Sequence, residues 1–133
     1  MKYQSNYYVM TPHDECLYIK NFSAWDHRAF KQFFSDIILI TEKHYRNKSW
    51  CVLADSLEWE LHTPDVNELV INAADQIPKM ASHVAQIIGD STLKKWQLEE
   101  MYKSIPAAEL KTFEVLQDGI EWLKALGYSV PKI

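Results

Sequence analysis

Two short apolar runs constrain the fold of this chain more than any other feature of its sequence. Residues 50–54 (WCVLA) and 83–88 (HVAQII) are each too short for a helix of ordinary length; the first is continuously apolar, and the second is mainly apolar. Short runs of this kind are typical of strands that are covered on both faces. Parallel strands need a crossover between them, which is usually a helix. The two runs therefore predict an α/β fold.

Two amphipathic segments beside these runs predict crossover helices. Asp26 is a suitable N-cap for the first helix. Residues 63–65 (TPD) join a capping threonine, a proline suited to the first helical turn and an acidic side chain that complements the helix dipole, so we expect a second helix over 64–77 that Pro78 ends. Apolar residues at three- and four-residue spacing mark the buried stripes, which are Ala29, Phe30, Phe33, Phe34, Ile37, Ile38 and Thr41 in the first helix and Val66, Leu69, Val70, Ala73, Ala74 and Ile77 in the second.

The remaining segments complete a regular order of strands and helices. Residues 6–10 and 16–22 are rich in aromatic and β-branched residues and flank a turn-like segment, which favours a hairpin. The fold class predicted is α/β, with one domain over residues 1–133 whose mixed, mainly parallel sheet opens with this hairpin and has helices packed on it. The other predicted elements are a helix over 93–103 with Trp96 in its core and Tyr102 at its rim, a strand over 109–113, and a helix over 116–126 that Gly127 ends.

Composition excludes several classes of function. The formal net charge is −4 and the basic residues are scattered, which argues against nucleic acid as a partner. No run approaches the length of a membrane span and the first residues lack the apolar centre of a signal peptide, so we expect a cytoplasmic protein without stable membrane insertion. Cys16 and Cys51 lie inside apolar runs and are expected to be buried, reduced thiols.

The sequence also lacks the common cofactor and metal motifs. With only three glycines, it contains neither a dinucleotide-binding fingerprint nor a P-loop. The five histidines and two cysteines show no ligand spacing, so we predict no cofactor and no metal. His83 opens a buried strand and is expected to be a structural histidine with its hydrogen bonds satisfied.

Polar and aromatic residues follow the predicted strands. Ligands of open parallel sheets collect outside the carboxyl ends of the strands. The residues predicted to bind a ligand or partner there are Trp25, Asp55, Ser56, Glu58, Trp59, His62 and Ser91. A purely structural reading is also open, in which Asp55 and Ser56 only cap a strand end. In that reading Glu58 and Glu60 are solvated, and Trp59 and Leu61 fold back to cover the sheet.

The order of elements and two segments resemble the SpoIIAA-like branch of the STAS domain superfamily. The segments are residues 52–56 (VLADS), at the end of a buried strand, and residues 113–123 (FEVLQDGIEWL), where a phenylalanine precedes a helix bearing Trp-Leu. The resemblance implies a non-catalytic domain that binds partner proteins or, in some members, nucleotides or lipids. In the anti-sigma-factor antagonists a serine of an Asp-Ser-Ser-Gly turn is phosphorylated, which implies phosphorylation of Ser56, although here residues 57–59 (LEW) replace Ser-Gly.

Three functions follow from these observations. The first is a binding or regulatory module that docks a protein partner or a small ligand at the strand-end face. The second is a small hydrolase or metal-assisted enzyme that uses Asp55, Glu58 or His62, since these residue types move protons or bind metals. The third is a structural homodimer built on the surplus aromatic residues. A large exposed apolar surface would favour binding or dimerisation, and a deep polar pocket with perturbed carboxylates would favour an enzyme.

Overall fold

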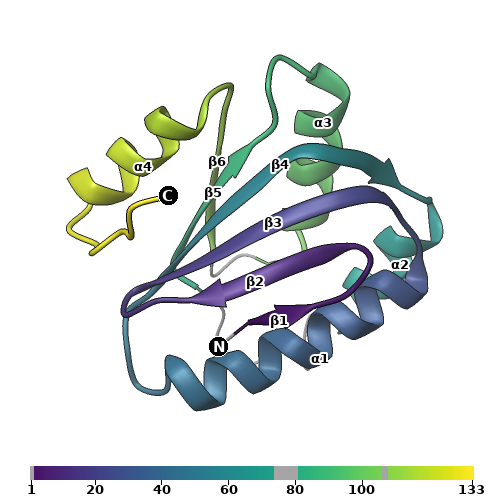
Figure 1. Cartoon of the computed structure of the whole chain (residues 1–133). Helices are drawn as coiled ribbons and strands as arrows, with labels where there is room; N and C mark the ends of the chain where they lie inside the picture. The colour runs from purple at the N-terminus through teal and green to yellow at the C-terminus, as the bar shows by residue number, and fades with distance from the viewer. Residues whose placement is uncertain (1, 74–80, 106–107) are drawn as a thin grey trace.

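A computed structural model of the chain describes residues 2–73, 81–105 and 108–133. Its single six-stranded sheet follows the order of the sequence, and the strands β1, β2 and β3 are antiparallel neighbours whereas β3, β4, β5 and β6 are parallel (Figure 1). The prediction of a mixed, mainly parallel sheet with an opening hairpin is therefore confirmed. The strands are β1 (Tyr3–Gln4), β2 (Tyr8–Pro12), β3 (Cys16–Trp25), β4 (Cys51–His62), β5 (His83–Ile87) and β6 (Glu109–Phe113).

Helices cover both faces of the sheet, but unequally (Figure 1). The three helices α1 (His27–His44), α2 (Asp65–Ala73) and α3 (Thr92–Tyr102) pack on one face, here called the three-helix face. The helix α4 (Leu116–Ala125) packs on the other, here called the α4 face. Because side chains alternate along a strand, Val52 and Ala54 of β4 face the three helices, while Cys51 and Leu53 face α4.

The helix α1 begins where the sequence predicted. Asp26 is its N-cap, and the Asp26 carboxylate accepts hydrogen bonds from the backbone N–H groups of Arg28 and Ala29, both at 3.0 Å. One member of the predicted stripe is wrong: Ile38 is 36% exposed, and Ile40 is fully buried. Ile40 lies three residues after the buried Ile37 and so returns to the same side of the helix, whereas Ile38 is turned away by about 100°.

The buried positions of the other two helices of this face differ in part from the prediction. In α2, Val66 and Val70 are buried as expected, but Leu69 is only half-buried. The predicted positions Ala74, Ile77 and Pro78 lie outside the described residues. In α3 the prediction for Trp96 is wrong, because its side chain is 56% exposed; the buried position is Leu98, on the other side of the helix.

The largest correction concerns β4. It was predicted to end at residue 54, but it continues to His62 and is twelve residues long. Its pairing with β3 shifts register twice. At the first shift, β3 advances two residues from Lys20 to Phe22 while β4 advances three, from Asp55 to Glu58. A second shift of the same kind follows before His62. Each shift is an irregularity of the β-bulge type and interrupts the alternation of inward and outward side chains. The polar segment 55–62 is therefore part of the sheet and not a loop after it.

Two predictions about single residues are confirmed. Cys16 and Cys51 are free, buried and directly opposite each other on β3 and β4. His83 is hydrogen-bonded through Nδ1 to the Tyr128 hydroxyl at 2.7 Å, and its Nε2 lies 3.2 Å from the Glu109 carboxylate. Among the described residues, no helix has the length and apolar character needed to cross a membrane.

Candidate ligand cavity

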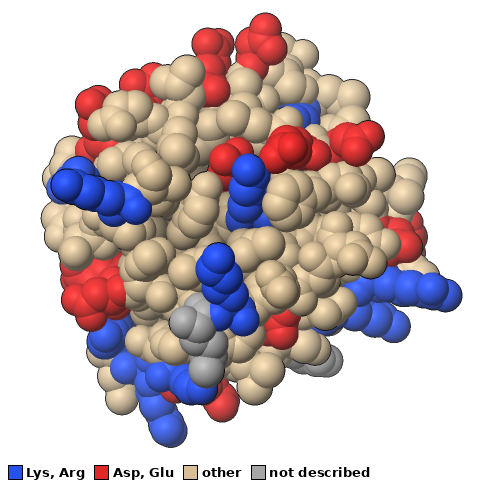
Figure 2. All heavy atoms as spheres, in the orientation of Figure 1, with Lys and Arg blue, Asp and Glu red and all other residues tan. Residues whose placement is uncertain are grey.

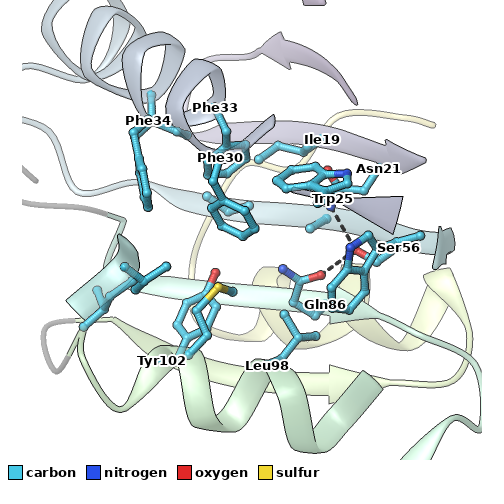
Figure 3. A pocket seen from close by; sticks show the side chains of 17 residues that line it. Ile19, Asn21, Trp25, Phe30, Phe33, Phe34, Ser56, Gln86, Leu98 and Tyr102 are labelled. Carbon is cyan, nitrogen blue, oxygen red and sulfur yellow. Dashed lines mark hydrogen bonds between the residues drawn. The ribbon is translucent and has the colours of Figure 1, made fainter. Parts of the chain in front are cut away.

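A row of three polar side chains lies inside the three-helix face. Asn21 of β3, Ser56 of β4 and Gln86 of β5 are 7%, 1% and 6% exposed, although their neighbours on this face are apolar. The Asn21 amide Nδ2 donates to Ser56 Oγ at 2.9 Å, and Ser56 Oγ donates to Gln86 Oε1 at 2.7 Å (Figure 3). The three side chains thus form a hydrogen-bonded polar row across three adjacent parallel strands.

One atom of this polar row has no partner. Asn21 Oδ1 is buried, and none of the described residues donates a hydrogen bond to it. Buried polar atoms are nearly always paired, because an unpaired one loses its hydrogen bonds to water without replacement. The side-chain oxygen of Asn21 therefore lacks a hydrogen-bond donor among the described residues.

The polar row forms one wall of a cavity between the sheet and the three helices. The cavity volume is about 50 Å³. Aromatic rings form much of the remaining wall: Trp25 lies with its ring centroid 4.9 Å from that of Phe30 and 5.2 Å from that of Phe33 (Figure 3). Trp25 is fixed in place because its Nε1–H donates to the backbone oxygen of Phe22 at 2.9 Å.

The cavity carries no formal charge. No lysine, arginine, histidine, aspartate or glutamate is among the described residues that line it. The Tyr102 hydroxyl points into it (Figure 3), and burial raises the pKa of this phenol to about 12. The direction of this shift is the one expected where a low-polarity environment disfavours an anion.

Three of the predicted site residues line this cavity, and the first bulge of β4 turns two of them, Ser56 and Trp59, toward the same face. Trp25, Ser56 and Trp59 all line it, although Ser56 and Trp59 are three residues apart and would face opposite sides of a regular strand. The first bulge is held by Lys94 of α3, whose Nζ donates to the backbone oxygens of Ser56 and Leu57, both at 3.1 Å. With Ser56 turned inward, its phosphorylation would require the hydroxyl to leave this polar row.

His62 lies next to the cavity but does not line it. Its ring is 5.8 Å from those of both Phe30 and Trp59, measured between centroids. Burial lowers the pKa of His62, although a hydrogen bond between Nε2 and the Asn67 side chain, 3.1 Å long, partly opposes this effect. The backbone of His62 is held by both ends of the Gln97 amide, each at 3.2 Å. These contacts anchor the end of β4 on α2 and α3.

The other predicted residues lie elsewhere. Glu58 is exposed and pairs with Lys20 at 3.3 Å, and the Asp55 charge acts on Tyr18, which faces away from the three helices. Ser91 is the N-cap of α3, where its Oγ accepts from the Lys94 N–H at 3.2 Å. The structure therefore does not bring Asp55, Glu58 and His62 into one site, and no group of three or more potential metal ligands occurs among the described residues.

Charged side chains on the outer surface are mixed in sign. On the face drawn in Figure 2, Lys and Arg side chains lie among Asp and Glu side chains. Pairs such as Lys48 with Asp14, at 3.4 Å, contribute to this mixing. Exposed ion pairs of this type add little to stability.

Two members of the site were not predicted. Asn21 was assigned to a strand and Gln86 to a buried run, but neither was singled out. Gln86 did carry a signal, since it is an amide between apolar residues of a buried run, whereas Asn21 lies between Lys20 and Ser23 and did not stand out. What the sequence could not supply was the alignment of Asn21, Ser56 and Gln86, which depends on the register of three strands.

The fold is similar to that of two solved structures. One is an uncharacterised protein of the DUF3478 family with a SpoIIAA-like fold, from Shewanella loihica PV-4, at 20% identity and a TM-score of 0.61, covering 91% of this chain and 98% of that chain. The other is the anti-sigma factor antagonist SpoIIAA in its unphosphorylated form, at 12% identity and a TM-score of 0.56, covering 88% of this chain and 97% of that one. No protein-family model and no curated protein matches the chain.

These likenesses extend over almost the whole of both chains and confirm the SpoIIAA-like fold that the sequence resemblance predicted. At such low identity they establish the fold alone, because one fold serves many functions. The function has to be argued from the cavity and the surface of this chain.

Proposed function

We propose that the chain is a non-catalytic binding module whose small, mainly apolar ligand occupies the cavity of the three-helix face. The observation that carries the proposal is the unpartnered Asn21 Oδ1 inside an otherwise aromatic and aliphatic wall. Ligand sites are commonly apolar clefts in which a few placed polar groups orient the ligand. A polar row of three hydrogen-bonded side chains, reaching the cavity from three strands, provides such an orienting group.

The position of the cavity also supports a regulatory role. Its walls come from the sheet and from α1, α2 and α3, so an occupant would contact several elements of the chain at once. A ligand that binds one arrangement of these helices more tightly than another shifts the population toward it. A partner that docks on the outer surfaces of the same helices would then sense whether the cavity is occupied.

Benzene is a suitable first probe of the cavity, because it is apolar and an engineered apolar protein cavity of about 150 Å³ binds it. In a ¹H–¹⁵N NMR titration we expect saturable shifts at the amides of Ala54, Ser56 and Gln86. Ala54→Leu should abolish them by filling the cavity, since Ala54 lines it.

Ala125→Leu is the matched control, because it adds the same atoms to an exposed position of α4. It should leave the benzene titration unchanged. Titrations that are the same for both variants, or shifts spread over the whole surface without saturation, would contradict the proposal.

A protein partner is the second candidate, favoured by an exposed apolar surface near the start of α3. Leu93 and Trp96 are 53% and 56% exposed and lie three residues apart, on one side of the helix. Leu57, 49% exposed, belongs to the bulge whose carbonyl Lys94 binds. SpoIIAA, whose fold is similar, is described as an anti-sigma factor antagonist.

Self-association is the most direct test of this surface, because it requires no unknown partner. If a second copy of the chain binds there, sedimentation velocity should show a dimer that Trp96→Glu dissociates, whereas Ile133→Glu, at another exposed apolar position, should not. A monomer at all protein concentrations would remove the homodimer from consideration.

A further inference from the structure

We propose that the ligand of the cavity is a small neutral molecule bearing a hydroxyl group, a phenol or an alcohol, whose O–H donates to Asn21 Oδ1. The inference rests on the proposed binding function and narrows it to a chemical class. It depends on the direction of the hydrogen bonds in the polar row, on the absence of charge in the cavity lining and on the size of the cavity.

The direction of the hydrogen bonds fixes what the cavity offers to a ligand. The Ser56 hydroxyl has a single proton, and it donates that proton to Gln86 Oε1. Ser56 Oγ can therefore only accept from Asn21, which turns the Asn21 amide nitrogen toward Ser56 and leaves Oδ1 without a donor. The unpaired atom, Asn21 Oδ1, is a hydrogen-bond acceptor, so a ligand group that pairs with it must be a donor.

The absence of charged side chains from the lining restricts which hydrogen-bond donors the cavity can accept. No charged side chain lines the cavity among the described residues, so an ionised carboxylate, phosphate or ammonium group would leave water without a compensating partner. Tyr102 illustrates the effect, because burial at this wall raises the pKa of its phenol to about 12 and so disfavours the anion. A neutral hydroxyl supplies a donor without this cost.

The size of the cavity limits the size of the ligand, and the side chains in its walls show where the cavity can widen. Its volume of about 50 Å³ exceeds the space of one water molecule but is about a third of the roughly 150 Å³ that holds benzene elsewhere. The walls include Met101, a side chain with three rotatable bonds, and the half-buried Phe34 and Ile105. A short alcohol therefore enters with little change, and an aromatic ring enters when these side chains rotate.

Benzene, phenol and benzoate test the proposal on the unaltered protein. Because the three share one ring, the cost of widening the cavity cancels between them, and only the polar group differs. We expect NMR titrations at neutral pH to show phenol binding about tenfold more tightly than benzene, since its hydroxyl pairs a buried acceptor. Benzoate, which is ionised at this pH, should not bind.

Asn21→Leu separates the hydrogen bond from the shape of the cavity. Leucine has a similar volume but no acceptor, so phenol should lose its advantage while the affinity for benzene is kept. Asn6→Leu, at an exposed position, is the matched control and should change neither affinity. The comparison of the three ligands stands without any variant if Asn21→Leu does not fold.

The outcomes distinguish the two proposals. Equal affinities for phenol and benzene, or binding of benzoate in the cavity, would overturn the hydroxyl inference and leave the binding function in place. A preference for phenol that persists in Asn21→Leu would also overturn it, because the donor would then pair elsewhere. Failure of all three ligands to bind would overturn the binding function together with the inference.

Discussion

Val52, Ala54 and Ser56 of β4 face three helices, whereas their neighbours Cys51 and Leu53 face only α4. The two faces share their strands, but they are packed differently. On the α4 face the helix lies so close to the sheet that a Cβ at Gly119 would be 2.6 Å from Ile87 Cδ1. On the three-helix face the side chains leave a cavity of about 50 Å³ and enclose a polar row.

The difference assigns separate tasks to the two faces. A face packed at the density of a crystal gains stability from every apolar contact. A face with a cavity and an unpaired polar atom gives up part of that gain, and such local departures from good packing tend to occur at functional sites. The α4 face therefore contributes more to stability, while the three-helix face retains a cavity.

The largest effect should come from weakening the α4 face. Leu123 is fully buried between α4 and the sheet, so we expect Leu123→Ala to lower the free energy of unfolding by about 3–5 kcal/mol. Leu126→Ala, at a 45% exposed position just after the same helix, should cost less than about 1 kcal/mol. Urea unfolding measures both, and equal losses would mean that α4 does not hold the sheet as described.

The second-largest loss of stability should come from breaking the polar row of the three-helix face. Ser56→Ala removes one oxygen but leaves both the Asn21 amide and Gln86 Oε1 unpaired, so the expected loss is about 2–3 kcal/mol. Ser49→Ala, at an exposed position, provides the control and should be nearly neutral. A Ser56→Ala protein as stable as the parent would show that the polar row contributes nothing to folding.

Enlarging a buried alanine should change the free energy of unfolding in opposite directions on the two faces. Ala54 lines the cavity and Ala85, on the neighbouring strand β5, is fully buried against the α4 side. We expect Ala54→Val to raise the free energy of unfolding by about 0.5–1 kcal/mol by filling space. Ala85→Val should lower it by about 1–2 kcal/mol by overpacking. Changes of the same sign would contradict the contrast between the faces.

The elements that the sequence predicted best are those with local signals. The strand β6 was predicted with its observed bounds, and Asp26 caps α1 because an aspartate before a helix can bond the first free N–H groups wherever the helix packs. The site was predicted in part: Trp25, Ser56 and Trp59 share the cavity, but Asp55, Glu58 and Ser91 do not.

The part that could not be predicted depends on contacts between distant segments. The first register shift of β4 places Ser56 and Trp59 on one face, and a second shift follows before His62. The two shifted segments are held by Lys94 and Gln97 of α3, which lie more than thirty residues further along the chain. No local pattern encodes a bulge that another element stabilises. Residues 57–62 (LEWELH) alternate between apolar and polar side chains, so the sequence did carry a strand signal that the prediction overlooked, whereas the shifts that decide which face each side chain takes left no such signal.

The smallest effect is a dependence of stability on pH that belongs to the three-helix face. His62 is buried beside Phe30 and Trp59, and burial lowers its pKa below the ordinary value of 6.5. In the unfolded chain the imidazole takes up a proton near that ordinary value, whereas in the folded protein it resists protonation. As the pH falls below 6.5, the unfolded state therefore binds more protons, and the free energy of unfolding must decrease.

The contribution of His62 is measured by comparing urea unfolding of the parent and His62→Gln at about pH 7.5 and about pH 5.5, on either side of the ordinary histidine pKa. Glutamine can still donate to the Asn67 side chain but does not titrate in this range, so the variant should lose less stability on acidification. The pKa of His44 is lowered as well, first by burial and then by Lys43, so His44→Gln should also reduce the loss, and the double variant should reduce it further. A decline in the parent that His62→Gln leaves unchanged would show that this ring accepts its proton as readily in the fold as in water, and the three-helix face would then be wetter than its cavity implies.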